Sequence, residues 1–246
     1  MRLRLFVFHH AGGSHLMYRD WPAHFPAGWQ VRIPDAPGRG PLDARPPVAD
    51  TAALVDHFLD ELGPELTGPF ALFGHSMGGV VAYELTRRLL AEGRTLPRWV
   101  GLSARAAPHP GGEAAGRHLL DDEALRRELL SMGGTPPAVL DDAELWALFA
   151  PAIRADLRVA ETWRPDPAAA PLPVPLSVYG GTRDTTSPPE RLTGWAARSR
   201  HFLGLHLFDG GHFYFQNDPT ALTAQITRDL RHALSLPAPP APGILR

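Results

Sequence analysis

The chain has 246 residues, of which 44% are hydrophobic and 20% are charged, and its formal net charge is -2. This composition predicts a single globular domain with its own core, and it lacks the basic excess of a nucleic-acid-binding protein. No apolar run approaches the roughly 18 residues of a membrane span, and the N-terminal apolar run is too short for a signal peptide, so we expect a cytoplasmic protein.

Two residue types are absent from the chain. It has no cysteine, which excludes thiol nucleophiles, disulfides and thiolate metal sites. It also has no lysine, which excludes Schiff-base chemistry and a serine–lysine pair. A covalent enzyme with this sequence must therefore use a hydroxyl or a carboxylate as its nucleophile.

Predicted strands and helices alternate along most of the chain, which indicates an α/β fold with a mainly parallel sheet covered on both faces. We expect helices at 51–62 and 77–92, each followed by a glycine, and a terminal helix from about 219 to 236. The Pro-rich residues 237–246 are expected to form a flexible tail. The expected strands are residues 3–9, 30–33, 70–74, 99–103, 176–179 and 206–208.

The alternation stops between about residues 108 and 171, where no segment has the pattern of a strand. Two stretches that begin with paired aspartates, "DDEALRRELLSMGG" and "DDAELWALFAPAIRADLRVAETW", have helical spacing. A helical insertion between two strands is suited to form a lid over a site, and the plainer alternative is a pair of helices that cover the sheet edge. Trp146, Phe149, Leu157 and Trp163 supply more apolar area than covering requires, which favours the lid.

The first predicted strand runs into "FHHAGGSH", where His9, His10 and His15 surround two glycines. A metal site is one interpretation, but neighbouring residues on a strand point to opposite faces, and no metal-binding spacing is present. We favour a loop that works through main-chain N–H groups, with Gly12 and Gly13 allowing close approach.

The strongest motif is "FALFGHSMGG", in which a buried strand enters "GHSMG" and continues directly into a helix. This G-x-S-x-G arrangement is the nucleophile elbow, a strained turn that lifts the serine hydroxyl clear of the sheet and admits only small residues two positions to either side. The helix N-terminus behind Ser76 offers unpaired N–H groups and a favourable dipole to a developing anion. We predict that Ser76 is the nucleophile and that the N–H of Met77 is one donor to the oxyanion.

A serine nucleophile needs a base, and in this architecture the chain order is serine, acid and histidine, with the histidine after the last strand. His212 fits this rule because it follows the final strand and a glycine pair in "LHLFDGGHF". His75 adjoins Ser76 but is expected to point elsewhere, as a packing or hydrogen-bonding neighbour. His201 and His206 lie before or within the last strand and are less well placed.

The acid that orients the base is expected at the end of a preceding strand. Asp184, in the Gly-rich stretch "GGTRDTT", is the predicted residue. Asp209 lies close to His212 in the sequence and is the rival, although it is better suited to ending the strand or capping its turn.

Together these motifs resemble the type II thioesterases, which are stand-alone α/β-hydrolases that serve polyketide and nonribosomal peptide synthases. The resemblance covers residues from about 3 to 236, and the A-G-G loop combined with "GGTPPAVL" is its most specific part. It rests on "FHHAGG", "PGRG", "GHSMGG", "GGTRD", "GGHF" and the insertion "LRRELLSMGGTPPAVLDDAELWALFAPAIRADLRVAETW".

The resemblance implies an α/β-hydrolase fold with a helical lid. It implies hydrolysis of acyl groups from the phosphopantetheine arm of acyl or peptidyl carrier proteins, with no metal or redox cofactor and no nucleic-acid or membrane partner. The implied triad is Ser76, Asp184 and His212, and the implied oxyanion donors are the backbone N–H groups of Met77 and Ala11. The implied role is editing, which means removing stalled or wrong short acyl groups from blocked carriers.

The family often has proline where this chain has His9, and a backbone role of the loop is expected to survive that change. Arg183 and Arg191 lie near the Asp184 loop and are candidates for meeting an acidic carrier helix, the alternative being solvated surface arginines.

Three other interpretations of the function stay open. The same triad would serve a small-molecule carboxylesterase or lipase, and with a hydroxyl or amine in place of water it would serve an acyltransferase or cyclising release domain. The last alternative is a non-catalytic binding module on a hydrolase scaffold, against which the complete set of serine, aspartate and histidine argues.

Overall fold

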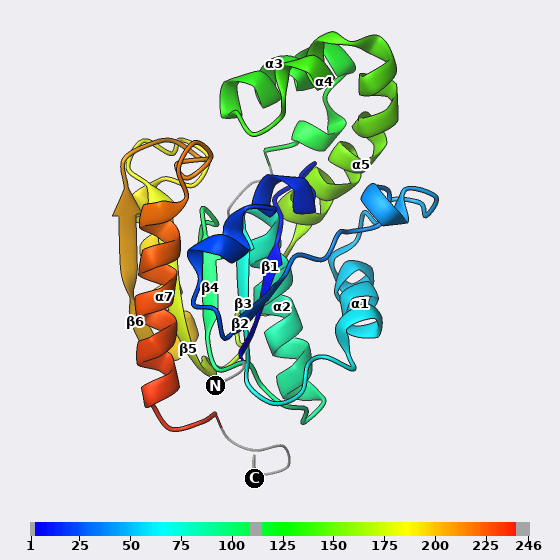
Figure 1. The fold of residues 1–246 in the computed structure, drawn as a ribbon. Coiled ribbons are helices and arrows are strands. Elements are labelled where there is room, and N and C mark those ends of the chain that lie inside the picture. Colours follow the sequence, from blue (N-terminus) through cyan, green and yellow to red (C-terminus); the bar gives the residue numbers. More distant parts are fainter. Residues whose placement is uncertain (1–2, 109–114, 240–246) are drawn as a thin grey trace.

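The computed structural model describes residues 3–108 and 115–239, which form a six-stranded sheet with helices on both faces (Figure 1). The strand order is β2-β1-β3-β4-β5-β6, and every neighbouring pair is parallel. The α/β-hydrolase architecture expected from the sequence is confirmed. The strands are β1 (Leu3–Phe8), β2 (Trp29–Arg32), β3 (Phe70–His75), β4 (Val100–Ser103), β5 (Leu172–Gly181) and β6 (Ser199–Phe208).

The last two strands begin earlier than the sequence predicts, at Leu172 for β5 and at Ser199 for β6. Pro173 and Pro175 obscure the start of β5, because proline donates no hydrogen bond to a sheet and is typical of a strand break. β5 accommodates both prolines because its pairing with β4 begins only at Leu176. β6 forms the sheet edge, and its polar first residues lack the apolar pattern of a buried strand.

The α-helices lie close to the predicted positions. Asp50 caps α1, since its carboxylate accepts the N–H of Ala53, and Gly63 follows the last residue of the helix. The terminal helix α7 begins directly after Pro219. Residues 237–239 follow it, and the rest of the predicted tail lies outside the described residues. The α-helices are α1 (Thr51–Leu62), α2 (Met77–Ala91), α3 (Asp122–Met132), α4 (Pro137–Asp141), α5 (Ala143–Thr162), α6 (Pro189–Leu192) and α7 (Thr220–Ser235).

The alternation of side chains along the strands gives the sheet two apolar faces. In β1, Phe6 and Phe8 pack with α1 and α2, whereas Leu5 and Val7 pack on the opposite face with α7. Because both faces are covered, the free part of the sheet is the edge at which the parallel strands end, and the loops that leave this edge build the site.

A helical insertion joins β4 to β5 and stands beyond that edge of the sheet (Figure 1). Asp121 caps α3 and Asp142 caps α5, as the paired aspartates predict, and the short α4 lies between these two helices. Residues 109–114, near the predicted start of the insertion, lie outside the described residues. The insertion has its own apolar cluster, formed by Leu125, Leu129, Leu140, Trp146, Ala150, Ile153 and Leu157.

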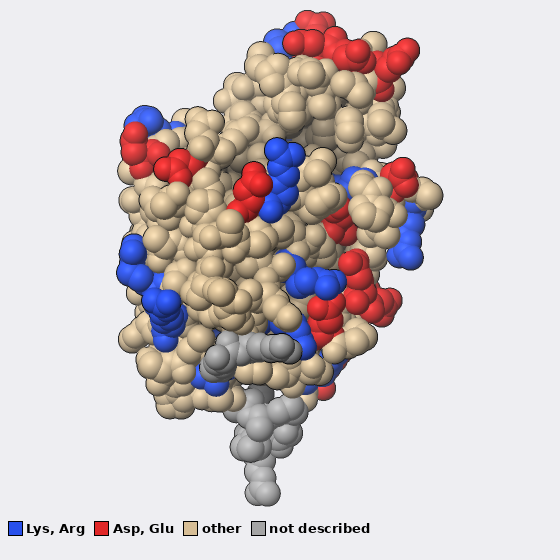
Figure 2. All heavy atoms as spheres, in the orientation of Figure 1, with Lys and Arg blue, Asp and Glu red and all other residues tan. Residues whose placement is uncertain are grey.

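The surface carries charges of both signs, and on the face shown in Figure 2 acidic side chains gather at the outer end of the insertion. The exposed acidic residues of the insertion include Asp121, Asp122, Glu123, Asp142 and Glu144.

Within residues 3–108 and 115–239, no helix combines the length and apolarity needed to cross a bilayer.

Candidate active site

Ser76 lies at a sharp turn between β3 and α2. Its backbone has φ 55° and ψ -112°, a conformation that is costly for a residue with a side chain and that persists only where the surroundings enforce it. The neighbouring strand helps to hold this conformation, because the N–H of Ser76 donates to the carbonyl oxygen of Ser103 at 2.8 Å. The predicted elbow is therefore present in the structure as a strained turn at the end of a central strand.

Two glycines permit this turn. A Cβ atom on Gly74 would lie 1.9 Å from the carbonyl oxygen of Gly78, and a Cβ atom on Gly78 would lie 2.1 Å from the carbonyl oxygen of Phe8. Both distances are far below van der Waals contact, and in both cases the obstructing atom is backbone that cannot rotate away. The first turn of α2 thus packs directly against the end of β1, which brings the loop after β1 next to Ser76.

His212 and Asp184 meet at the ends of β5 and β6. The Nδ1 of His212 lies 2.8 Å from the Oδ2 of Asp184, and both side chains are buried. The Oδ1 of Asp184 accepts the N–H groups of Thr186 at 2.8 Å and Ser187 at 3.0 Å. Burial acts to raise the pKa of Asp184, but the hydrogen bonds from His212 and the two amides outweigh it and lower the pKa below the ordinary value. The carboxylate stays ionised and holds the Nδ1–H of the imidazole.

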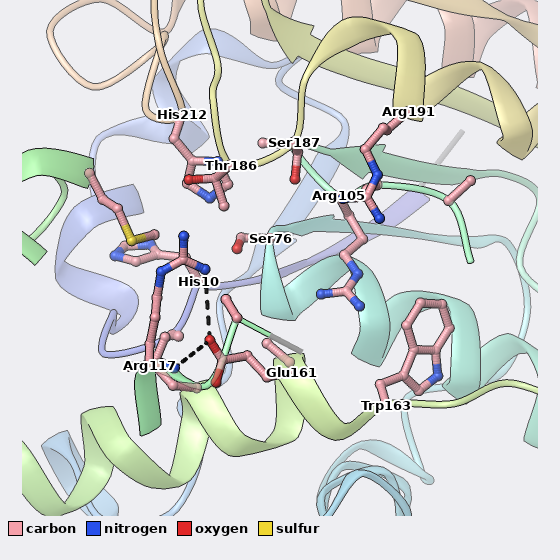
Figure 3. Close-up of a pocket in the computed structure, with 18 of the residues that line it drawn as sticks. His10, Ser76, Arg105, Arg117, Glu161, Trp163, Thr186, Ser187, Arg191 and His212 are labelled. Atoms are coloured by element: carbon pink, nitrogen blue, oxygen red, sulfur yellow. Dashed lines mark hydrogen bonds and ion pairs between the residues drawn. The ribbon is translucent and has the colours of Figure 1, made fainter. Parts of the chain in front are cut away.

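The other imidazole nitrogen of His212 is available for chemistry. Its Nε2 is buried and has no hydrogen-bond partner among the described residues, and His212 lines the same cavity as Ser76 (Figure 3). With Nδ1 protonated toward Asp184, this Nε2 carries the lone pair that a general base needs. The structure thus brings Ser76, His212 and Asp184 to one edge of the sheet, as the sequence predicts.

The rival side chains are engaged elsewhere. Asp209 is exposed and forms an ion pair with Arg183, so it does not orient His212. The Nδ1 of His75 lies 2.8 Å from the hydroxyl oxygen of Ser103, which confirms that this histidine is a hydrogen-bonding neighbour. His206 lies against Asp229 on the last helix.

His10 and His75 surround the predicted base, His212, without carrying charge. Burial, followed by the charge of nearby His212, holds the pKa of His75 well below its ordinary value. Burial and neighbouring His9 do the same for His10. The ring of Phe213 lies against all three imidazoles of the cluster. A proton taken up at His212 therefore meets no second imidazolium beside it.

The loop after β1 presents the second predicted oxyanion donor. Among the described residues, neither the N–H of Ala11 nor that of Met77 has a hydrogen-bond acceptor, and Ala11 lines the cavity with Ser76. Gly12 has φ +74°, and a Cβ atom there would lie 2.8 Å from the Cγ1 of Ile153 on α5. A glycine is thus required both by the turn and by the contact of the loop with the insertion.

A buried ion pair that sequence reasoning missed holds this loop in place. The guanidinium of Arg39 donates to both carboxylate oxygens of Asp156 on α5, at 2.5 and 2.8 Å, and also to the carbonyl oxygen of Gly13 at 3.0 Å. The carboxylate in turn accepts the N–H of Gly12 at 2.8 Å. Both charged side chains are almost fully buried. In the sequence, the only signals of this pair were the "PGRG" motif and an aspartate on the buried face of a helix.

The remaining histidines of "FHHAGGSH" are structural. The Nδ1–H of His9 donates to the carbonyl oxygen of His10 at 2.8 Å, and its Nε2 accepts the N–H of Ala36 at 3.2 Å. Burial, followed by the charge of Arg39, lowers the pKa of His9 and keeps it in this neutral form. His15 lies 2.6 Å from a carboxylate oxygen of Asp35. Within the described residues, no group of three potential ligands is placed to hold a metal ion.

Ser76 opens into a cavity of about 480 Å³ that lies between the sheet edge and the insertion. Leu129 of α3 and Leu157 and Glu161 of α5 line it from the insertion, and Thr186 and Ser187 line it from the loop after β5. The insertion therefore walls a chamber over the serine, as a lid does, and is more than a cover for the sheet edge.

The model of the thioesterase domain family matches residues 3–230. The chain belongs to this family. Among its relatives is the gramicidin S biosynthesis protein GrsT of Aneurinibacillus migulanus, 30% identical over 95% of this chain and 91% of GrsT. Another is thioesterase PikA5 of Streptomyces venezuelae, 31% identical over 87% of this chain and 76% of PikA5.

Solved structures agree with this assignment. The type II thioesterase BorB from the borrelidin biosynthetic cluster is 34% identical, covers 94% of each chain and superposes with a TM-score of 0.84. The resemblance to type II thioesterases is thus confirmed over nearly the whole chain, and the protein is a thioesterase of the serine hydrolase type.

We expect Gly78→Ala to lower the free energy of unfolding of the thioesterase by about 3 kcal/mol, because its new Cβ would overlap the backbone of β1. Denaturant unfolding measures the change. Gly211→Ala is the matched control, since the nearest atom to its Cβ would lie 4.0 Å away, and it is expected to change stability by less than about 0.5 kcal/mol. Equal effects of the two substitutions would show that the elbow tolerates a side chain at Gly78.

We expect the double variant Arg39→Met/Asp156→Leu to remain folded while its kcat falls by about 100-fold, because the loop loses its anchors at Gly12 and Gly13. Asp156→Leu alone is expected to be the less stable protein, since it leaves the Arg39 guanidinium buried without a counter-charge. Unfolding midpoints and kcat on a butyryl thioester of pantetheine separate the two effects. A double variant with wild-type kcat would mean that the ion pair serves stability alone.

Proposed function

We propose that the protein hydrolyses acyl thioesters carried on the phosphopantetheine arm of acyl or peptidyl carrier proteins, through an acyl-Ser76 intermediate. In this way it edits a synthase of polyketides or nonribosomal peptides. The observation that carries the proposal is that Ser76 and the unpartnered Nε2 of His212 face one chamber walled by the insertion. Membership of the thioesterase family gives the bond that is cleaved.

In the first half of the reaction, the Ser76 hydroxyl oxygen attacks the carbonyl carbon of the thioester while its proton passes to Nε2 of His212. The negative charge that develops on the carbonyl oxygen is met by the N–H groups of Met77 and Ala11, which have no acceptor among the described residues. The carbon–sulfur bond then breaks, and the leaving thiol takes the proton from His212. Asp184 stabilises the imidazolium between these steps, because its carboxylate is ionised.

In the second half, water replaces the thiol. His212 removes a proton from the water, the hydroxide attacks the acyl-serine carbonyl, and the same two N–H groups meet the second oxyanion. Collapse of this intermediate releases the carboxylic acid and returns the proton to Ser76. The insertion limits access to the chamber, so the acyl group has to fit between α3, α5 and the sheet edge.

A carrier protein is the partner that relatives of this kind suggest, since BorB comes from the borrelidin biosynthetic cluster and another similar type II thioesterase, YbtT, comes from the yersiniabactin NRPS/PKS pathway. The outer end of the insertion is acidic, which disfavours an acidic carrier helix there (Figure 2). Of the two arginines considered for docking, Arg183 is already paired with Asp209. Arg191 lies at the cavity itself and is better suited to meet the substrate.

Ser76→Ala is expected to lower kcat by roughly 1,000-fold or more, as in other serine hydrolases, and to leave the unfolding midpoint unchanged. A fluorophosphonate probe is expected to label the wild type at Ser76 and to leave this variant unlabelled. Substantial residual turnover would mean that another residue is the nucleophile, and an unlabelled wild type would favour a non-catalytic binding module.

The wild type is expected to hydrolyse butyryl-pantetheine with a higher kcat/KM than the matched oxygen ester. The matched oxygen ester carries the same butyryl group on a small alcohol and therefore lacks the pantetheine arm. The chamber is expected to select the substrate that carries this arm. Initial rates over a range of concentrations measure both constants. A higher kcat/KM on the oxygen ester would make the protein a small-molecule esterase.

A further inference from the structure

The loop after β6 has to carry His212 across the sheet. β6 forms one edge of the sheet, whereas Ser76 lies at the end of β3, three strands away. Neighbouring strands are about 4.8 Å apart, so the loop spans roughly 14 Å to bring the base to the nucleophile. Asp184 holds the Nδ1 of His212 at 2.8 Å. That hydrogen bond fixes one ring nitrogen and leaves the backbone from which the ring extends without an anchor.

Tyr214, two residues after His212, ties this loop to β4. Its hydroxyl oxygen lies 2.8 Å from the hydroxyl oxygen of Ser103, the last residue of β4. The tyrosine ring stacks on Phe208, with centroids 5.3 Å apart and ring planes 3° apart. Gly210 makes room for it, since its φ is +138° and a Cβ atom there would lie 2.9 Å from the Cβ of Tyr214. The tyrosine thus reaches from β6 to β4, past the strand between them.

Ser103 is shared between the base loop and the nucleophile elbow. Its carbonyl oxygen accepts the N–H of Ser76 at 2.8 Å, and its hydroxyl oxygen lies 2.8 Å from the Nδ1 of His75. Ser103 is fully buried and lies directly beside His75 in the pairing of β3 with β4. One residue therefore holds the turn of the nucleophile through its main chain and the loop of the base through its side chain.

The hydrogen bonds of this tie run in one direction. Burial raises the pKa of Tyr214, so the phenol keeps its proton. Ser103 is the one hydrogen-bond partner of this phenol among the described residues, so Tyr214 donates to Ser103. The Ser103 hydroxyl then donates to the Nδ1 of His75, which accepts because burial holds the pKa of this imidazole well below its ordinary value. The tie consists of neutral groups and adds no charge beside His212.

We propose that Tyr214 and Ser103 are positioning residues that act through His212. The hydrogen bond between them fixes the base loop against the elbow and keeps the Nε2 of His212 turned toward Ser76. This inference rests on the triad of the proposed function and adds two residues that do not line the chamber. Since neither residue touches the substrate, their effect falls on kcat and not on KM.

Tyr179 provides a matched control for the phenol hydroxyl. It is fully buried on β5, and its hydroxyl donates to the carboxylate of Asp229 on α7 at 2.5 Å. Asp229 also accepts from the side-chain amide of Gln225 at 2.7 Å, so it keeps a partner when the tyrosine hydroxyl is removed. Tyr179→Phe therefore deletes a buried hydroxyl of the same kind from a contact that does not involve the base loop.

The test measures kcat, KM and the unfolding midpoint on butyryl-pantetheine. We expect Tyr214→Phe and Ser103→Ala each to lower kcat by about 10- to 100-fold with KM unchanged, because a catalytic group displaced by about 1 Å can lose that much. The double variant is expected to lose about as much as either single variant, since both substitutions break the same hydrogen bond. Tyr179→Phe is expected to keep the wild-type kcat, although its unfolding midpoint falls at least as far as that of Tyr214→Phe.

A second comparison tests whether the tie acts through the base. In a His212→Ala background, Tyr214→Phe is expected to change the residual kcat by less than about 2-fold, because no imidazole is left to misplace. A tyrosine that served folding alone would lower the residual turnover by the same factor as it does in the wild type.

Three results would overturn the proposal. These are a Tyr214→Phe variant with the wild-type kcat, an equal loss with and without His212, and a loss confined to KM, which would make Tyr214 part of substrate binding. Failure of the triad gives a different result, because His212→Ala itself would then keep substantial turnover. If only the positioning role is wrong, His212→Ala loses turnover and Tyr214→Phe does not.

Discussion

The active site depends on the packing of backbone against backbone where the first turn of α2 meets the end of β1. This contact exists because Gly78 has no side chain to keep the two segments apart. It fixes Ser76 in a strained conformation and, at the same time, sets the loop that follows β1 beside it. One steric constraint thus positions both the proposed nucleophile and its expected oxyanion donors, so neither has to be placed by flexible side chains.

The buried Arg39–Asp156 pair adds a second layer to this arrangement. An ion pair of this kind seldom adds net stability, because removing two charges from water costs about as much as their attraction returns. Its value here is geometric, since the two side chains together hold the N–H of Gly12 and the carbonyl oxygen of Gly13. His9 contributes to the same end, because its ring joins the carbonyl oxygen of His10 to the N–H of Ala36.

Local patterns were enough to predict the mainly parallel sheet and the strand ends at which the proposed site residues lie. The elbow, the Gly-Gly-His turn and the Asp184 loop each lie at the end of a strand, and parallel strands bring their carboxyl ends to one edge. The start of β5 was hidden by Pro173 and Pro175, whose tolerance depends on which neighbouring strand is paired there. That is a property of the assembled sheet.

The features that escaped prediction depend on residues far apart in the chain. Arg39 and Asp156 are separated by 117 positions, and nothing local marks them as partners. The hydrogen bond between Ser103 and Tyr214 is of the same kind, because a strand residue and a loop residue 111 positions apart become neighbours only in the fold. In the sequence, neither residue could be told from an ordinary core residue.

The tie between Asp156 and the loop after β1 also divides the insertion mechanically. A rigid swing of all three helices would pull a buried carboxylate out of its guanidinium and expose both charges without partners. The contact of α3 with α5 is mainly apolar, through Leu125 and Leu129 against Trp146 and Ile153, and its ion pair between Asp122 and Arg154 lies at the surface. The entrance can therefore widen by movement of α3 on a hinge at Gly133 and Gly134, between α3 and α4, while the wall that touches the loop stays fixed. Substrate entry and the geometry of catalysis are in this way mechanically independent.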